Sequence, residues 1–226
     1  AVGVDALTSS TTGSNSTAVG KDALAANTTG SENTAVGQAA LNSHTTGVDN
    51  TALGRSSGFD LTTGSNNLLL GHDAGRSSSP HHVTTDQHQI VLGDNNITNA
   101  FIKVSFTVTS DERDKTDIAD FTKGLDIVNS LRPVTYKWDM RSNYSDDLSA
   151  TPDGTHKKEK TEIGLIAQEV ETIEKANGYG TDENDRLFIT KSTDGLHYGL
   201  KYERLVPILV NAIKELSAKV TALEAA

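Results

Sequence analysis

The sequence lacks several features that commonly stabilise a protein. Its 226 residues include no cysteine, one tryptophan and only 5% aromatic residues, so neither disulfides nor thiolate metal sites can form. It contains no run of about 18 apolar residues, and no segment is expected to span a membrane. The net charge of −10 argues against a surface that binds nucleic-acid phosphates. Most aromatic residues follow position 100, so the first hundred residues must bury their surface in another way.

Short motifs recur every 17 residues in this first part of the chain. Two small or apolar residues and a glycine end at Gly3, Gly20, Gly37, Gly54 and Gly71. A Thr-Thr-Gly motif has the same spacing, at 11–13, 28–30, 45–47 and 62–64. An Ala-Leu pair occurs at 6–7, 23–24 and 40–41, and Asn33, Asn50 and Asn67 hold matching positions. Since Ala1-Val2-Gly3 already occupies a repeat position, we expect the sequence to be part of a longer chain.

The repeat predicts a β-solenoid or β-roll over residues 1–95. Each unit has two short β-like runs separated by turns, where glycine adopts the conformations that other residues avoid. One such unit cannot bury its own apolar side, so successive units must stack. Alanine and valine make a thin interior, which association of several chains would supplement. A last Val91-Leu92-Gly93 follows after 22 residues, and the extra length predicts a loop around 77–82.

The phrases NTTGSENTAVG and AVGKDAL, within residues 27–37 and 18–24, carry a resemblance. The repeat region resembles the repetitive heads of trimeric surface adhesins and the shafts of phage tail fibres. The resemblance implies a parallel assembly of three chains.

Three histidines fall in or near the predicted loop: His81, His82 and His88. They can line a metal site if chains meet on an axis. No carboxylate or further histidine has ligand spacing, so a polar surface loop is the preferred interpretation. The sequence predicts no metal and no cofactor.

The pattern changes from residue 100 onward, and the second half predicts a linker strand followed by an α+β domain. Residues 100–108 alternate as a strand, within a linker that spans 96–109. Residues 120–131 predict a helix capped by Asp120 and stopped by Pro133. A strand over 134–138, a polar loop over 141–160 and a strand running into a helix over 162–170 follow. Residues 177–185 predict a solvated loop, because their acids lack the spacing of a calcium loop.

The last segment predicts a coiled coil over residues 202–224. Its apolar positions recur in steps of four and three: Tyr202, Val206, Leu209, Ile213, Leu216, Val220 and Leu223. Val and Ile at one core position with Leu at the other favour two strands, whereas the repeat region favours three. We expect three, because a short seam follows the larger assembly to which it is joined. A single amphipathic helix packed on its own domain is the alternative.

The boundary between the two halves reads Ser110-Asp111-Glu112-Arg113-Asp114-Lys115. An N-capped, solvated turn is its plain interpretation. It is followed, in order, by the segments 125–138, 163–170 and 202–216. This order of motifs resembles the intramolecular chaperone and autoprocessing domain at the C-terminus of phage endosialidases, tailspikes and tail fibres, over about residues 108–226.

The resemblance implies a homotrimer whose C-terminal domain, residues 110–226, guides folding of the shaft and then cuts itself off. It implies cleavage between Thr109 and Ser110, with Ser110 and Lys115 as a catalytic dyad. A serine needs a base to become nucleophilic, and lysine acts as one only when its pKa falls. Five residues do not place two side chains on one helix face, so a turn or a neighbouring chain must bring Lys115 to Ser110.

Two other functions remain open. The first is a purely structural trimeric adhesin or fibre tip that binds the host surface without cleavage. The second is a hydrolase of an external substrate, which is disfavoured because no GxSxG motif, metal set or carboxylate pair stands out. Membrane-bound eukaryotic transcription factors carry a similar processing domain, but the acidic charge and the adhesin-like repeat argue against that class. We expect a virion appendage, or alternatively a bacterial surface protein, that binds a receptor or glycan through its shaft, without nucleic acid or membrane insertion.

Overall fold

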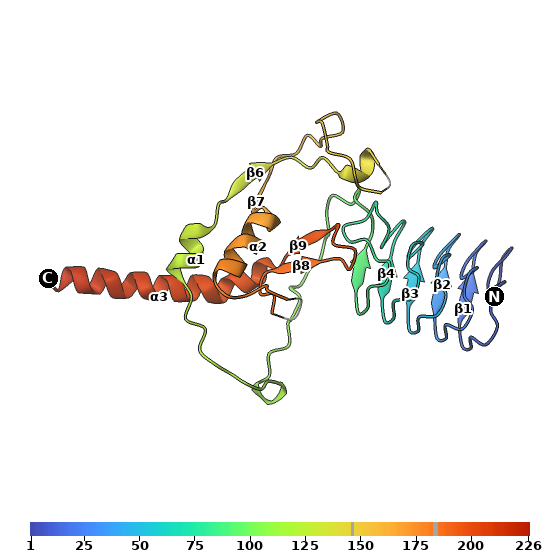
Figure 1. Cartoon of the computed structure of the whole chain (residues 1–226), viewed down its shortest axis with the longest axis horizontal. Helices are drawn as coiled ribbons and strands as arrows, with labels where there is room; N and C mark the ends of the chain where they lie inside the picture. Colours follow the sequence, from blue (N-terminus) through green and yellow to red (C-terminus); the bar gives the residue numbers. More distant parts are fainter. Residues whose placement is uncertain (146, 183–184) are drawn as a thin grey trace. The chain divides into compact units, whose positions relative to one another are not determined.

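The computed structural model describes residues 1–145, 147–182 and 185–226, which form two compact units (Figure 1). The first unit comprises Ala1–Thr98, Tyr136–Glu162 and Lys191–Tyr198. The second comprises Asn99–Thr135, Ile163–Thr190 and Gly199–Ala226. Each unit is therefore assembled from segments on both sides of the boundary at residue 110. Within the described residues, no helix is both long and apolar enough to cross a membrane.

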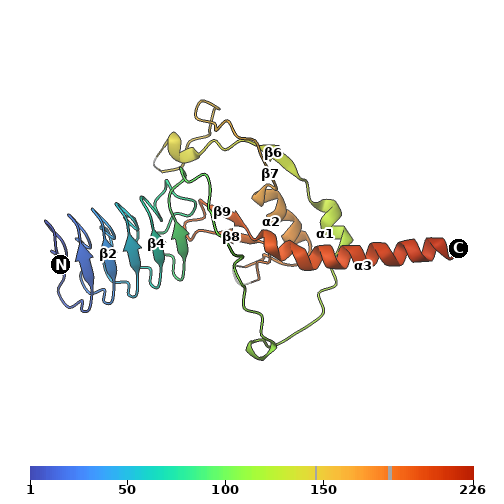
Figure 2. The same ribbon diagram turned by 180° about the vertical axis from the view of Figure 1, so that it is seen from behind.

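A parallel β-solenoid dominates the first unit. Its strands are β1 (Thr17–Val19), β2 (Thr34–Val36), β3 (Thr51–Leu53), β4 (Leu68–Leu70) and β5 (Ile90–Leu92), in that order. Thr17 pairs with Thr34 and Thr34 with Thr51, so one coil is one 17-residue repeat. Leu68 pairs with Ile90, 22 residues later. Figures 1 and 2 show the coils stacked in a row. The predicted repeat and its longer last coil are confirmed.

Small side chains fill the interior of the solenoid. The central residue of each strand is buried: Ala18, Ala35, Ala52, Leu69 and Val91. The Ala-Leu pairs found in the sequence supply the other side, with Leu24 and Leu41 fully buried. Burial of one leucine stabilises the fold by about 1.5–3 kcal/mol. Each coil buries few such residues, so it depends on its neighbours.

Glycine is required where two coils approach most closely. Gly37 has a φ of 138°, and a Cβ placed there would lie 2.4 Å from the carbonyl oxygen of Gly54 in the next coil. Gly20 stands in the same relation to Gly37, at 2.5 Å. A side chain at either position would meet backbone atoms that cannot move aside. The recurring glycine of the sequence is explained by this stacking.

Among the described residues, all α-helices belong to the second unit, and several short strands lie partly within it. Beyond β6 (Val134–Tyr136), which pairs with β7 (Glu162–Gly164), the chain forms α2 (Ala167–Ala176). The strands β8 (Ile189–Lys191) and β9 (Tyr198–Leu200) form a hairpin, and α3 (Leu205–Glu224) follows. The predicted strand at 134, the loop after it and the strand-to-helix segment from 162 are confirmed. The predicted loop 177–185 falls partly outside the described residues.

The helix α1 (Leu125–Ser130) packs against α3. Ile127 of α1 is buried, as are Ile208 and Ala212 of α3. A Cβ on Gly124 would lie 2.6 Å from the amide nitrogen of Ala212, so this position admits only glycine. The Glu215 carboxylate accepts a hydrogen bond from the Leu125 amide at 3.3 Å and thereby caps α1 from α3.

Two predicted elements differ from the structure. The helix expected over 120–131 begins only at Leu125, and its cap residue is Gly124 rather than Asp120. The close approach of Gly124 to α3 sets this start, and it is not visible in the local pattern. The strand expected over 100–108, within the linker 96–109, is absent as well. Alternation of apolar and polar residues indicates a segment that suits a strand, but a strand also needs a hydrogen-bonded partner strand.

The last helix has the predicted extent and two distinct apolar faces. The 3₁₀ turn Tyr202–Arg204 leads directly into α3. One face, with Ile208 and Ala212, is covered by its own chain. The other carries the predicted seam, where Ile213 is 67% exposed and Leu223 is 77% exposed. The seam is therefore not the face that packs on the domain. The solenoid, the mixed α and β region and the C-terminal helix agree with the predicted fold class.

Candidate functional site: the Ser110–Lys115 turn

A single 3₁₀ turn, Glu112–Asp114, shapes the boundary segment. The Asp111 side chain caps this turn by accepting a hydrogen bond from the Arg113 amide at 2.9 Å. The Lys115 amide closes it with a hydrogen bond to the Glu112 carbonyl at 3.1 Å, after which the backbone is extended again. The polar residues of the sequence therefore form the N-capped turn that they predict.

The turn brings Ser110 and Lys115 into contact. Lys115 Nζ donates to Ser110 Oγ at 2.6 Å and lies 3.2 Å from the Ser110 carbonyl oxygen. Both distances belong to one chain, so no neighbour is needed for this contact. The turn, one of the two routes that the spacing left open, thus brings the two side chains together within one chain.

Arg113 holds the turn in place rather than acting on Lys115. Its Nε and Nη2 donate to the two carboxylate oxygens of Asp111, at 3.0 and 2.6 Å. The hydrogen bonds from the Arg113 side chain and amide hold the pKa of Asp111 below its ordinary value. Asp111 is thereby engaged by Arg113, which leaves the Lys115 ammonium directed at Ser110. We call this paired arrangement the Asp111–Arg113 fork.

The whole turn is exposed to solvent, as is the segment before it. Phe101 is 95% exposed, Phe106 is 80% exposed and Val108 is 76% exposed. Side chains of this size are normally covered in a folded protein. The exposed apolar segment 101–108 leads directly to the Thr109–Ser110 bond.

The histidines of the solenoid loop belong to the first unit, whereas this turn belongs to the second. His88 contacts Asn66 through Nδ1 at 2.9 Å, whereas His81 and His82 lie in a separate polar cluster with aspartates. Among the described residues, no group of three His, Asp or Glu side chains is arranged to hold a metal ion.

The polar cluster around His82 was not foreseen from the sequence. Its members include Asp194, which follows His82 by 112 residues and contacts it at 3.0 Å. No spacing or motif links residues so far apart.

Comparison with protein families identifies the region that begins at the turn. Residues 110–179 match the model of the family Peptidase_S74, described as chaperone of endosialidase. No curated protein matches the chain, and no solved structure does. The resemblance of the C-terminal part to endosialidase chaperone domains is confirmed. Such a domain behind a β-solenoid fits a phage tail-fibre-like protein, and the family's name denotes a peptidase.

Proposed function

We propose that the chain is the C-terminal part of a phage tail fibre or tailspike-like protein that cuts itself between Thr109 and Ser110. The observation that carries this proposal is the 2.6 Å contact between Lys115 Nζ and Ser110 Oγ. The contact lies at the residue where the family match begins. Ser110 is the nucleophile and Lys115 the base of a serine–lysine dyad.

The reaction is an acyl shift followed by hydrolysis. Lys115 accepts the hydroxyl proton, and Ser110 Oγ attacks the carbonyl carbon of Thr109. The C–N bond breaks, and Lys115 returns the proton to the Ser110 nitrogen, which leaves an ester between the two residues. Water then hydrolyses the ester to the Thr109 carboxylate and the Ser110 hydroxyl. Each chain turns over once, because the product lacks the scissile bond.

Trimerisation provides the environment that this chemistry requires. Lysine becomes a base when burial disfavours its charged form, and the turn is exposed in the single chain. Packing of three copies around segment 101–108 covers the turn and strengthens the polar interactions that stabilise an oxyanion. An unassembled chain would therefore stay intact, and cleavage would report correct assembly.

Three apolar surfaces on the chain support a homotrimer. The first is the seam of α3, and the second is the exposed segment 101–108. The third runs along the outer face of the solenoid, where Val19 is 39% exposed, Leu53 is 52% exposed and Leu92 is 58% exposed. These three residues occupy the same position in their strands and form a stripe parallel to the stack. In a symmetric assembly, each of these surfaces can pack against the same surface of a neighbouring copy.

The domain would act as a folding template for the shaft. A repetitive parallel sheet can pair out of register, and its long-range contacts form slowly. A trimeric C-terminal domain sets the register once, so coils can form from that end. Removal of the template leaves a shaft that is slow to unfold and hence kinetically stable. The folded shaft would bind a host receptor or glycan on a virion appendage, or in the alternative on a bacterial surface.

Denaturing electrophoresis with intact mass measurement tests the cut. The wild-type chain should give fragments of 109 and 117 residues, the second being 226 − 109. Ser110→Ala and Lys115→Arg should each give one intact chain, since neither has both nucleophile and base. Ser105→Ala and Lys103→Arg, in the same exposed segment, serve as controls that should cleave. An intact wild-type chain in a trimer would indicate the structural adhesin instead.

A further inference from the structure

The tip of the β8–β9 hairpin, residues 192–197, is shaped by its own hydrogen bonds. The Ser192 amide donates to the His197 carbonyl at 3.1 Å, and the His197 amide donates to Ser192 Oγ at 3.0 Å. Asp194 Oδ1 accepts from the Leu196 amide at 2.9 Å and from Ser192 Oγ. The second oxygen of Asp194 and the Thr193 amide remain directed away from the tip.

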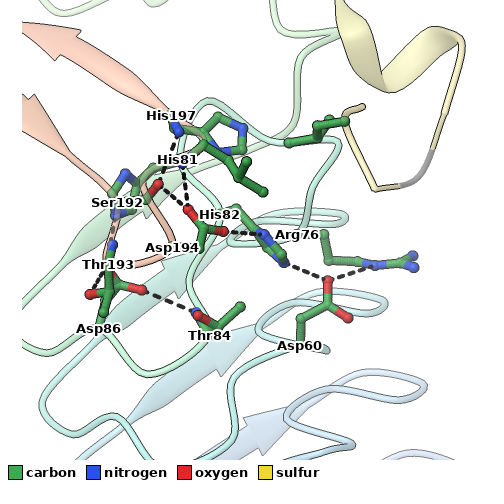
Figure 3. Close-up of polar contacts among 12 residues, drawn as sticks. Asp60, Arg76, His81, His82, Thr84, Asp86, Ser192, Thr193, Asp194 and His197 are labelled. Atoms are coloured by element: carbon green, nitrogen blue, oxygen red, sulfur yellow. Dashed lines mark hydrogen bonds and ion pairs between the residues drawn. The ribbon is translucent and has the colours of Figure 1, made fainter. Parts of the chain in front are cut away.

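Both of these groups meet the last coil of the solenoid (Figure 3). Asp86 Oδ1 accepts from the Thr193 amide at 2.8 Å and from the Thr193 hydroxyl at 2.6 Å. Asp86 is only 5% exposed, so its charge depends on these donors. The tip belongs to the same compact unit as the solenoid.

His82 bridges the tip to a second aspartate of the solenoid. Its Nδ1 lies 3.0 Å from Asp194 Oδ2, and its Nε2 lies 3.1 Å from Asp60 Oδ2. Ionised carboxylates only accept hydrogen bonds, so both ring nitrogens must donate. Only the doubly protonated imidazolium has two N–H groups. The arrangement of His82 between two carboxylates is therefore that of a protonated histidine.

We propose that this cluster is a proton-controlled clamp, in which the His82 imidazolium and Asp86 hold hairpin tip 192–197 on the last solenoid coil. The proposal rests on the cleavage proposed above in one respect. The tip lies beyond the Thr109–Ser110 bond, so the clamp keeps the C-terminal fragment attached to the shaft after the cut. Its partner is that fragment of the same chain, and loss of the His82 proton promotes release.

Several charged groups surround His82. Asp60 and Asp194 face it directly, and Arg76 Nε lies 3.9 Å from the same Asp60 oxygen. His197 of the tip has its ring centre 6.1 Å from that of His82, and His81 lies 3.6 Å from Asp86. Arg141 adds positive charge near His197.

Because of these groups, we expect the tip to be clamped most strongly at an intermediate pH. Burial alone lowers the pKa of His82, but the hydrogen bonds and charges of Asp60 and Asp194 outweigh it and raise the pKa above 6.5. Clamping is thus complete below pH 6.5 for this group and is lost as the pH rises through the raised pKa. Burial, together with the charges of His82, His81 and Arg141, lowers the pKa of His197 to about 4. As the pH falls from 6.5 to about 4, His197 takes up a proton more readily when the tip is free than when it is clamped. This difference favours the free tip, so clamping weakens over that range.

Hydrogen exchange on the intact Ser110→Ala chain tests the clamp without requiring any cleavage. The measured quantity is the protection factor of amides in 192–197, corrected for the intrinsic effect of pH. We expect protection to fall about tenfold from near-neutral pH to about pH 8.5, the size expected when one charged hydrogen bond is lost. His82→Gln in the same background should show low protection with no such fall. His88→Gln, a histidine of the same coil outside the cluster, should behave like the parent. A fall that persists in His82→Gln would overturn the proposal.

Size-exclusion chromatography of the cleaved protein tests attachment. The two fragments should co-elute at pH 6.5 and separate at about pH 8.5, and Asp194→Asn should make them separate at both. Fragments of Asp194→Asn that still co-elute as the parent does would overturn the role of the clamp in attachment. Absence of fragments in the wild type would instead refute the cleavage proposal, and the exchange experiment would then decide the clamp alone.

Discussion

The side-chain amide of Asn50 donates to Oδ1 of Asn33, one coil earlier, at 3.0 Å. Asn67 repeats this contact with Asn50 at 2.9 Å. The side-chain amide of each asparagine also donates a hydrogen bond to a backbone carbonyl of the following turn. For Asn50 this is the Gly64 carbonyl, at 2.9 Å. The three asparagines are buried and form a ladder along the stack. They satisfy turn carbonyls that would otherwise lie inside the solenoid without partners.

Replacing the middle residue of this ladder should weaken the shaft markedly. Asn50→Ala leaves the Gly64 carbonyl without the donor and the Asn67 amide without the acceptor that the Asn50 side chain supplies. We expect the free energy of unfolding to fall by about 2–4 kcal/mol, as two buried groups lose their bonds. Urea unfolding at one protein concentration measures this. Asn42→Ala, at a half-buried asparagine with one hydrogen bond to the Asp22 carbonyl, should cost clearly less. Equal losses would show that the ladder has no special role.

His44 should make the solenoid sensitive to acid. It occupies the repeat position of Asn27, and both contact a turn carbonyl: His44 Nε2 that of Gly47 at 3.0 Å, and Asn27 Nδ2 that of Gly30 at 2.9 Å. Burial lowers the pKa of His44 below 6.5, so the folded state disfavours its charge. Stability should therefore decline as the pH falls below 6.5, because the unfolded chain takes up the proton first.

The substitution His44→Asn restores the residue of the preceding coil and removes this titration. Thermal unfolding between neutral pH and about pH 5 should then show a smaller decrease in Tm than in the parent. His156→Asn, in the loop between β6 and β7, is the matched histidine control and should leave the decrease unchanged. A parent-like decrease in His44→Asn would assign the acid sensitivity to another group.

The Asp111–Arg113 fork should set the rate of self-cleavage without taking part in it. Asp111→Asn keeps an oxygen that can cap the turn but loses the ionic fork, so Lys115 would reach Ser110 less often. We expect cleavage to slow by roughly tenfold, comparable to the loss of one charged hydrogen bond. A time course on denaturing gels gives the rate, with Glu112→Gln as control. Unchanged cleavage in Asp111→Asn would show that the turn is held by its backbone alone.

The seam of α3 should control assembly. Ile213→Asp places a charge among the apolar seam residues, which a bundle of helices cannot bury without a partner charge. We expect light scattering to give the mass of a single chain and cleavage to be lost with the trimer. Ser217→Asp introduces the same charge at an exposed polar position of α3 and should remain trimeric. If light scattering instead gave the mass of a trimer for Ile213→Asp, assembly would depend on the solenoid stripe or on segment 101–108.

The sequence predicted those features that repeat or lie close together along the chain. The 17-residue coil, its longer last turn and the C-terminal helix were all visible, because each depends on local periodicity. The start of α1 was predicted wrongly because Gly124 is fixed by the distant Ala212. The strand over 100–108 was predicted from alternation alone, which says nothing about whether a partner is present. Ser110 and Lys115 were identified through a family resemblance, whereas the contact of His82 with Asp194 joins segments that no local pattern connects.

The stacking of Gly37 against Gly54 fixes the length by which each coil extends the shaft. Because the glycine of each coil must stack on the glycine of the next, a regular coil can be added only as a whole unit of 17 residues. Adjacent strands lie about 4.8 Å apart, so one inserted unit would extend the shaft by that amount and leave both ends unchanged. A unit of any other length must project its surplus sideways, as the 22-residue coil does before β5. Duplication or deletion of whole repeats is therefore a route by which the reach of such a fibre can change without redesign of its ends.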